Sequence, residues 1–148
     1  MGTHHKGPTD EVRALDAYIK LMRAAESVST RIHGHLKDAD LTVCQFGVLE
    51  AVHHLGALSQ RQLGDKLLRS GGNITMVVDN LEKRGLVRRE RCPEDRRVYR
   101  VHLLPAGARL IRRVFPVHAK AVAADMSALT PSETDDLGRL CRKLGKRP

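Results

Sequence analysis

Apolar residues recur every three or four positions over most of this chain, and that spacing is typical of amphipathic helices. The first stripe runs through residues 10–36 and predicts a long helix with one apolar face. Later stripes predict helices over about 42–55, 60–68 and 71–84, and two more helices follow from Pro105 onward. The pattern therefore predicts a mainly helical protein.

Three of these helices begin with the same pattern, a Ser or Thr followed three positions later by Gln or Glu. In this capping box the hydroxyl accepts a hydrogen bond from the amide three residues on, while the Gln or Glu side chain accepts one from the first amide. The pairs are Thr42 with Gln45, Ser59 with Gln62, and Thr130 with Glu133. The boxes agree with the apolar stripes and indicate where these helices begin.

The periodicity changes after residue 85. The segments 86–91 and 98–103 are short, rich in β-branched residues and partly alternating, and the charged stretch 92–97 separates them. This pattern predicts a β-hairpin with a charged tip. Two helices joined by a turn come directly before it. The expected fold class is therefore mainly α with a small β-hairpin wing (α+β), which is a winged helix-turn-helix.

Positive charge is concentrated on the same region. The chain has 26 Lys and Arg against 17 Asp and Glu, a net charge of +9. Residues 60–113 hold 14 of the basic and 6 of the acidic residues, so almost all of the excess lies there. A basic helix-turn-helix predicts double-stranded DNA as the partner. Since no basic amphipathic helix remains elsewhere, we expect no membrane partner.

Several protein classes are disfavoured by what the sequence lacks. It has no run of 18 apolar residues and no apolar signal segment near residue 1. Its three cysteines make no disulfide framework, and no Cys or His spacing is typical of a metal site. No nucleophile–base motif indicates an enzyme. We therefore expect a cytoplasmic binding protein without a metal or other cofactor.

The chain resembles the MarR family of bacterial transcriptional regulators over about residues 12–145. The segments that carry the resemblance, in family order and spacing, are Leu41-Thr42-x-x-Gln45-Phe46-x-Val48-Leu49, Leu58-Ser59-x-x-x-Leu63, Asn73-Ile74-Thr75-x-x-Val78-Asp79-x-Leu81-Glu82-Lys83-Arg84-Gly85-Leu86-Val87, Asp95-Arg96-Arg97-Val98 and Leu104-Pro105-x-Gly107. The resemblance implies one MarR-type domain over residues 1–148. It places a DNA-binding module at 42–104 and dimerisation helices at 10–36 and 105–145. Two modules of a homodimer would meet half-sites about 34 Å apart.

The resemblance assigns the 71–84 helix and the wing to DNA. Asn73 and Thr75 would hydrogen-bond base edges or phosphate, and Met76 would touch a thymine methyl group. In the family an arginine of the wing enters the minor groove and an aspartate holds it, which matches Arg97 and Asp95 here. The other residues expected at DNA are Ser59, Ser70, Gly72, Lys83 and Arg96.

The family also implies a signal that releases the DNA. We expect a repressor that a small phenolic or aromatic effector, or oxidative or quinone stress, removes from a pseudo-palindromic operator. An apolar pocket with a few polar groups would hold such an effector. The residues expected to line it are Tyr18, Met22, His33, Phe46 and Arg113.

Two alternatives remain open. One is a thiol-based redox sensor that uses Cys44, in the first turn of a helix, or Cys92, expected to be accessible beside the wing. Cys141 is expected in the core. The other is an architectural DNA-binding protein without an effector.

Overall fold

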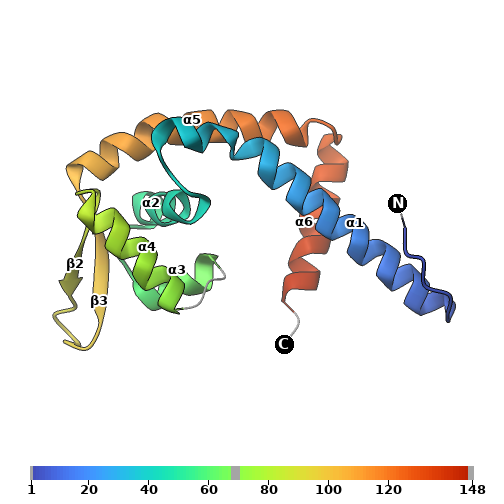
Figure 1. The fold of residues 1–148 in the computed structure, drawn as a ribbon, viewed down its shortest axis with the longest axis horizontal. Coiled ribbons are helices and arrows are strands. Elements are labelled where there is room, and N and C mark those ends of the chain that lie inside the picture. The colour runs from blue at the N-terminus through green and yellow to red at the C-terminus, as the bar shows by residue number, and fades with distance from the viewer. Residues whose placement is uncertain (1, 68–70, 147–148) are drawn as a thin grey trace. The chain divides into compact units, whose positions relative to one another are not determined.

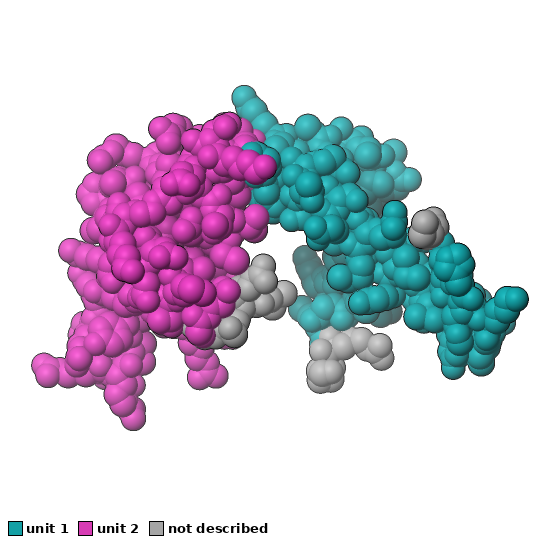
Figure 2. Space-filling model, viewed as in Figure 1, with its two compact units in different colours: residues 1–34, 119–148 teal, residues 35–118 magenta. Residues whose placement is uncertain are grey.

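The computed structural model describes residues 2–67 and 71–146, which fall into two compact units (Figure 1, Figure 2). The terminal unit combines residues 1–34 and 119–148, and the central unit is residues 35–118. In chain order the elements are α1 (Thr9–Ile32), the 3-10 helix η1 (Gly34–Ala39), α2 (Val43–Leu55), β1 (Leu58–Ser59), α3 (Gln60–Leu67), α4 (Gly71–Lys83), β2 (Val87–Arg91), β3 (Tyr99–Leu103), α5 (Pro105–Met126) and α6 (Pro131–Gly145). The predicted fold class is confirmed. In the described chain no helix is both long and apolar enough to cross a membrane.

All three capping boxes are present at the predicted helix starts. In each, the hydroxyl accepts from the amide of the third residue on, and the Gln or Glu side chain accepts from the amide of the capping residue. The pairs are Thr42 with Gln45, Ser59 with Gln62, and Thr130 with Glu133. These bonds satisfy amides that have no partner inside their own helix.

The wing is part of a three-stranded antiparallel sheet with the order β1-β3-β2. Strands β2 and β3 form the predicted hairpin, with Arg89 opposite Val101. On its other side β3 pairs with β1, a strand of two residues that the sequence pattern did not predict. Because Ser59 is the first residue of a capping box and Leu58 directly precedes it, the two residues show only the signal of a helix start.

The core of the central unit is built from the predicted helix faces. The apolar face of α4 is fully or almost fully buried; it consists of Ile74, Val77, Val78 and Leu81. In α2 the residues Phe46, Leu49 and Val52 are buried, whereas Val43 is 44% exposed. Val43 is the first residue of α2, and its side chain lies outside the core that the later turns form.

The C-terminal end of α4 is closed by Gly85. Its φ is +69°, a left-handed conformation that favours glycine. The Gly85 amide donates to Glu82 O, and the Leu86 amide donates to Leu81 O. This pair of hydrogen bonds forms a Schellman motif, which turns the chain directly into β2.

The terminal unit has a different character, because none of its described residues is buried. Here α1 ends at Ile32, so the expectation of one helix through residue 36 is wrong. Gly34, a poor helix former, begins η1 instead. Within the unit Arg31 Nη2 donates to Asp125 Oδ2 at 2.9 Å, and this bonding holds the pKa of Asp125 below its usual range.

Candidate nucleic-acid interface

The face of α4 opposite its buried stripe is open to solvent. Gly72, Thr75 and Met76 are exposed, Met76 by 58%, and Asn73 is half-buried. Because the buried stripe fixes the helix rotation, these side chains form one outward face at its N-terminal half. Ser70, which the sequence also assigns to DNA, lies outside the described residues.

Lys83 is exposed at the other end of α4. It lies eleven residues after Gly72, which is roughly 16 Å along an α-helix. Its contact with a DNA phosphate stays a prediction.

The start of α3 lies beside the wing. Ser59 there is held in its capping box, so its hydroxyl and its amide already bond to Gln62. Ser59, Gln60 and Arg61 line a groove of about 300 Å³ together with Arg97 and Tyr99 of the hairpin. The fold thus brings Ser59 next to Arg97, two residues that are far apart in the sequence.

The wing tip holds an extended arginine. The Arg97 side chain is 90% exposed, and its Nε donates to Asp95 Oδ1 at 3.1 Å. A second bond joins Arg97 Nη2 to Asp95 Oδ2 at 3.3 Å, so the contact is bidentate. Hydrogen bonding from Arg97 keeps the pKa of Asp95 below its usual range. Arg96 beside it is exposed.

A second arginine, Arg89, fixes α4 against the sheet and was missed at the sequence level. Its guanidinium binds Asp79 Oδ1 at 2.7 Å and Glu82 Oε1 at 3.0 Å, both in α4. Its Nε donates to Gln60 Oε1 at 2.7 Å, and the side-chain nitrogen Nε2 of Gln60 donates to the Thr75 hydroxyl. The signal available in the sequence was the pair Asp79 and Glu82, two acids one helical turn apart in a basic region.

Four of the six acidic side chains of residues 60–113 bind arginines of the same region. Asp79 and Glu82 bind Arg89, Asp95 binds Arg97, and Glu90 binds Arg88. The positive excess of residues 60–113 therefore lies largely on side chains such as Arg61 and Arg96, which are exposed.

The five residues expected at an effector pocket divide between the two units. Tyr18, Met22 and His33 belong to the terminal unit, where Tyr18 is 59% and Met22 50% exposed. Phe46 and Arg113 belong to the central unit, where Phe46 is a buried core residue. Their joint role stays a prediction.

A smaller cleft of the central unit contains Arg113. Its volume is about 220 Å³, and Arg113 lines it with His35, Asp38 and Val117. His35 Nε2 is buried and has no hydrogen-bond partner among the described residues. Within the described chain no cluster of three His, Cys, Asp or Glu side chains is arranged to hold a metal ion.

The structure changes the interpretation of two cysteines. Cys92, expected to be accessible, is 6% exposed, and its thiol donates to Glu94 Oε2 at 2.8 Å. This bond lowers the pKa of Glu94. Cys141, expected in the core, is exposed on α6 because that helix has no buried residue in its unit. Cys44 is half-buried in the first turn of α2, close to the expectation.

Three comparisons place the chain among known proteins. The sequence pattern of the MarR family matches residues 39–98. The uncharacterized HTH-type transcriptional regulator YkoM of Bacillus subtilis (strain 168) is 35% identical over 133 residues, which cover 90% of this chain and 86% of YkoM. The HTH-type transcriptional regulator MhqR of the same organism is 33% identical over 133 residues, covering 90% and 92%.

A solved structure gives the same result for the fold. Sco3205, a MarR family transcriptional regulator from Streptomyces coelicolor crystallised in complex with DNA, superposes with a TM-score of 0.84. It is 27% identical in sequence, and the match covers 99% of this chain and 94% of that one.

Proposed function

The chain belongs to the MarR family of DNA-binding transcriptional regulators, and from this premise we propose that it is a repressor that binds a pseudo-palindromic operator as a homodimer. Residues 42–104 then read the DNA, while α1 (Thr9–Ile32) and the helices at 105–145 join two copies. The observation that carries the proposal is that one module presents both the open face of α4 and an extended Arg97 held by Asp95.

The proposed contacts follow from this geometry. The N-terminal half of α4 enters the major groove, where Asn73, Thr75 and Met76 reach base edges. Arg97 extends from the wing into the minor groove, where negative potential is concentrated. Arg96 and the amides at the start of α3, next to Ser59, bind backbone phosphates.

The homodimer is supported by the terminal unit, in which none of the described residues is buried. Its helices expose apolar stripes at 37–59% of the side-chain surface; the residues are Leu15, Tyr18, Met22, Leu137, Leu140 and Leu144. Exposed apolar surface of this extent is typical of an interface. A second copy would bury both stripes.

The release signal is proposed to be a small aromatic or phenolic compound. The cleft at Arg113 supports this part, because its guanidinium would bind a carboxylate or phenolate. Buried His35 Nε2 would gain a hydrogen-bond partner from the same ligand. Thiol oxidation at Cys92 is less favoured, because that sulfur is buried.

The test is DNase footprinting upstream of the protein's own gene, followed by affinity measurements on the protected sequence. We expect a short palindrome and a loss of affinity of roughly a thousandfold between 50 and 200 mM salt, if six or more phosphates are bound. Arg97→Ala should weaken binding about tenfold or more, whereas Arg142→Ala, an exposed arginine of α6, should not.

The outcomes separate the proposal from its alternatives. Uniform low-affinity coating of DNA would indicate an architectural protein. Equal affinity for wild type and Arg97→Ala would contradict the wing contact. If the protein binds a palindrome but no phenol, aromatic acid or oxidant releases it, the proposed DNA binding is retained and the proposed effector is rejected.

A further inference from the structure

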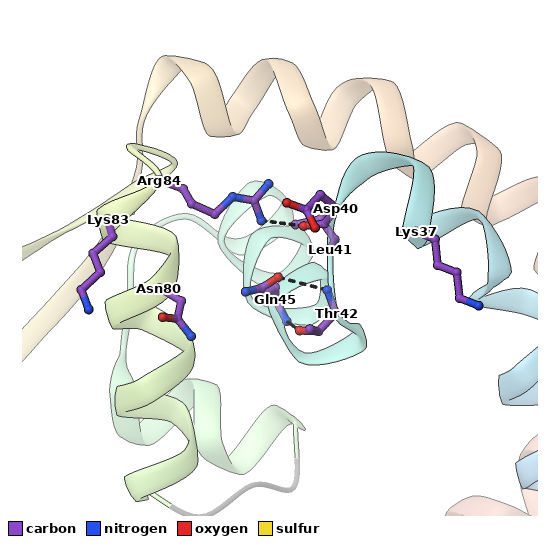
Figure 3. Close-up of a pocket in the computed structure, with 8 residues that line it drawn as sticks. All are labelled: Lys37, Asp40, Leu41, Thr42, Gln45, Asn80, Lys83 and Arg84. Carbon is purple, nitrogen blue, oxygen red and sulfur yellow. Dashed lines mark hydrogen bonds between the residues drawn. The ribbon is translucent and has the colours of Figure 1, made fainter.

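A cleft of the central unit lies at the end of α4 opposite the proposed DNA-reading half. Its volume is about 540 Å³, and it lies between η1, the start of α2 and the last turn of α4 (Figure 3). Its polar lining comes from these elements and the residues next to them, and consists of Lys37, Asp40, Thr42, Gln45, Asn80, Lys83 and Arg84. The proposed base contacts of α4 and the wing do not use this cleft, and Lys83 is the lining residue that it shares with the residues expected at DNA.

The cleft carries an excess of positive charge. Three cations, Lys37, Lys83 and Arg84, face one carboxylate, that of Asp40. Among the described residues none of the three cations forms a salt bridge, in contrast to Arg88, which pairs with its neighbour Glu90. Two positive charges are therefore left without an acidic partner in one concave site.

The donors of the cleft are held in place by the fold. Arg84 Nη1 donates to Asp40 O at 2.7 Å, which fixes the guanidinium and leaves its other N–H groups able to donate. The Gln45 side-chain oxygen accepts from the Thr42 backbone amide, so the side-chain nitrogen Nε2 of Gln45 stays available to donate. In Figure 3 Asn80 lies between Lys83 and Gln45, and the lysines come from different elements.

We propose that this cleft binds a small polyanion of the phosphoanhydride class, such as inorganic pyrophosphate or the diphosphate of a nucleotide. Lysine ammonium groups and an arginine fork are the usual partners of phosphate oxygens. A ligand with two linked phosphates would lie over Arg84 and the side-chain amides of Gln45 and Asn80, with Lys83 on one side of the cleft and Lys37 on the other.

DNA phosphate has the same chemistry, so the source of the anion has to be distinguished. Lys83 lies roughly 16 Å along α4 from Gly72, at the opposite end from the proposed base contacts. A free ligand therefore fits the site without competing for the DNA-reading face. The inference goes beyond the repressor function and does not depend on it.

The experiment is calorimetric titration of the full-length protein with inorganic pyrophosphate at fixed ionic strength. We expect one site per chain, and affinity at least about tenfold lower in the double variant Lys37→Ala/Lys83→Ala, because the cleft loses two positive charges that attract the anion. The matched control is Lys20→Ala/Lys120→Ala, which removes the same charge from exposed positions in the terminal unit. That control should bind as wild type does.

Three results would overturn the proposal. One is the absence of pyrophosphate binding to the wild-type protein, and another is an equal loss of affinity in the two double variants. The third is a loss of DNA affinity in Lys37→Ala/Lys83→Ala as large as that of Arg97→Ala with no pyrophosphate present. This last result would assign the cleft to the DNA backbone. Circular dichroism of both variants controls for folding.

Discussion

Arg89 Nη2 lies 2.7 Å from Asp79 Oδ1, and this contact joins strand β2 to helix α4. The same guanidinium also binds Glu82 and, through Gln60, reaches Thr75 on the exposed face of α4. Arg89 is only 18% exposed, so its contacts are better shielded from water than those of a surface ion pair. Arg89 thus ties the proposed recognition helix to the wing, in addition to the contacts of its buried apolar face.

We expect Arg89→Met to lower the free energy of unfolding by about 1–3 kcal/mol, because it leaves the carboxylates of Asp79 and Glu82 without their cation. Urea denaturation followed by circular dichroism measures this. The control is Arg88→Met, an arginine 57% exposed that pairs with Glu90 on the surface, where a change within about 0.5 kcal/mol is expected. Equal effects of the two substitutions would contradict the role of Arg89.

Gly107 permits a close approach between α5 and the start of β2. A Cβ at this position would overlap the backbone oxygen of Leu86 and lie 2.9 Å from Leu103 Cδ1. Because backbone cannot give way as a side-chain end can, Gly107→Ala should destabilise the protein by about 1–3 kcal/mol. Gly138 in α6 has open space around it, so Gly138→Ala should be neutral or stabilising by up to about 1 kcal/mol. Thermal unfolding of the two variants, with opposite signs expected, provides the measurement.

The local features of this fold could be predicted because their signals lie within a few residues. The buried face of α4 follows from its spacing, the helix starts follow from the capping boxes, and the hairpin follows from the change of period. The bidentate pair of Asp95 and Arg97 is also local, since two positions separate the residues.

The missed features depend on residues that are distant in the sequence. Strand β1 exists because Leu58 pairs with Val101, and no pattern around Leu58 reveals this. The Arg89 network joins Gln60, Thr75 and β2 across 29 positions at its widest. The burial of Cys92 likewise comes from its tertiary position, whereas its sequence neighbours, Pro93 and Glu94, suggested an exposed turn.

The exposed apolar stripe of α6 predicts a dimer interface that a single charged substitution should disrupt. Leu140 is 52% exposed in the single chain, and in a homodimer it would be buried. Leu140→Asp should then convert the dimer to monomer, because a buried unpaired carboxylate is costly. Light scattering after size-exclusion chromatography reports the mass. Arg142→Asp places the same charge on the other side of the helix and should leave the dimer intact; a wild-type protein that is monomeric would reject the homodimer itself.

The thiol of Cys92 should be protected in the folded protein. In a variant with Cys44→Ser and Cys141→Ser, a thiol reagent should modify Cys92 far more slowly without urea than with it, because the side chain is 6% exposed and its Sγ donates to Glu94. The corresponding protein with only Cys44, which is half-buried, should react faster. Rapid modification of folded Cys92 would restore it as a redox candidate.

The pKa of Asp95 reports on its bond with Arg97, the contact on which the proposed function rests. Hydrogen bonding from Arg97 favours the carboxylate and lowers that pKa, so the contact is present at pH values above the pKa of an unfolded aspartate and is lost as pH falls through the lower folded value. Arg97→Gln should therefore raise the pKa of Asp95 toward that of a free aspartate, as measured by NMR titration of its carboxyl carbon. Arg96→Gln removes the neighbouring charge but not the bond, and should change the pKa much less. Equal rises of the pKa in both variants would mean that the surrounding positive charge, and not the bidentate bond, lowers the pKa of Asp95. In that case Asp95 would not hold Arg97 in place for the minor groove.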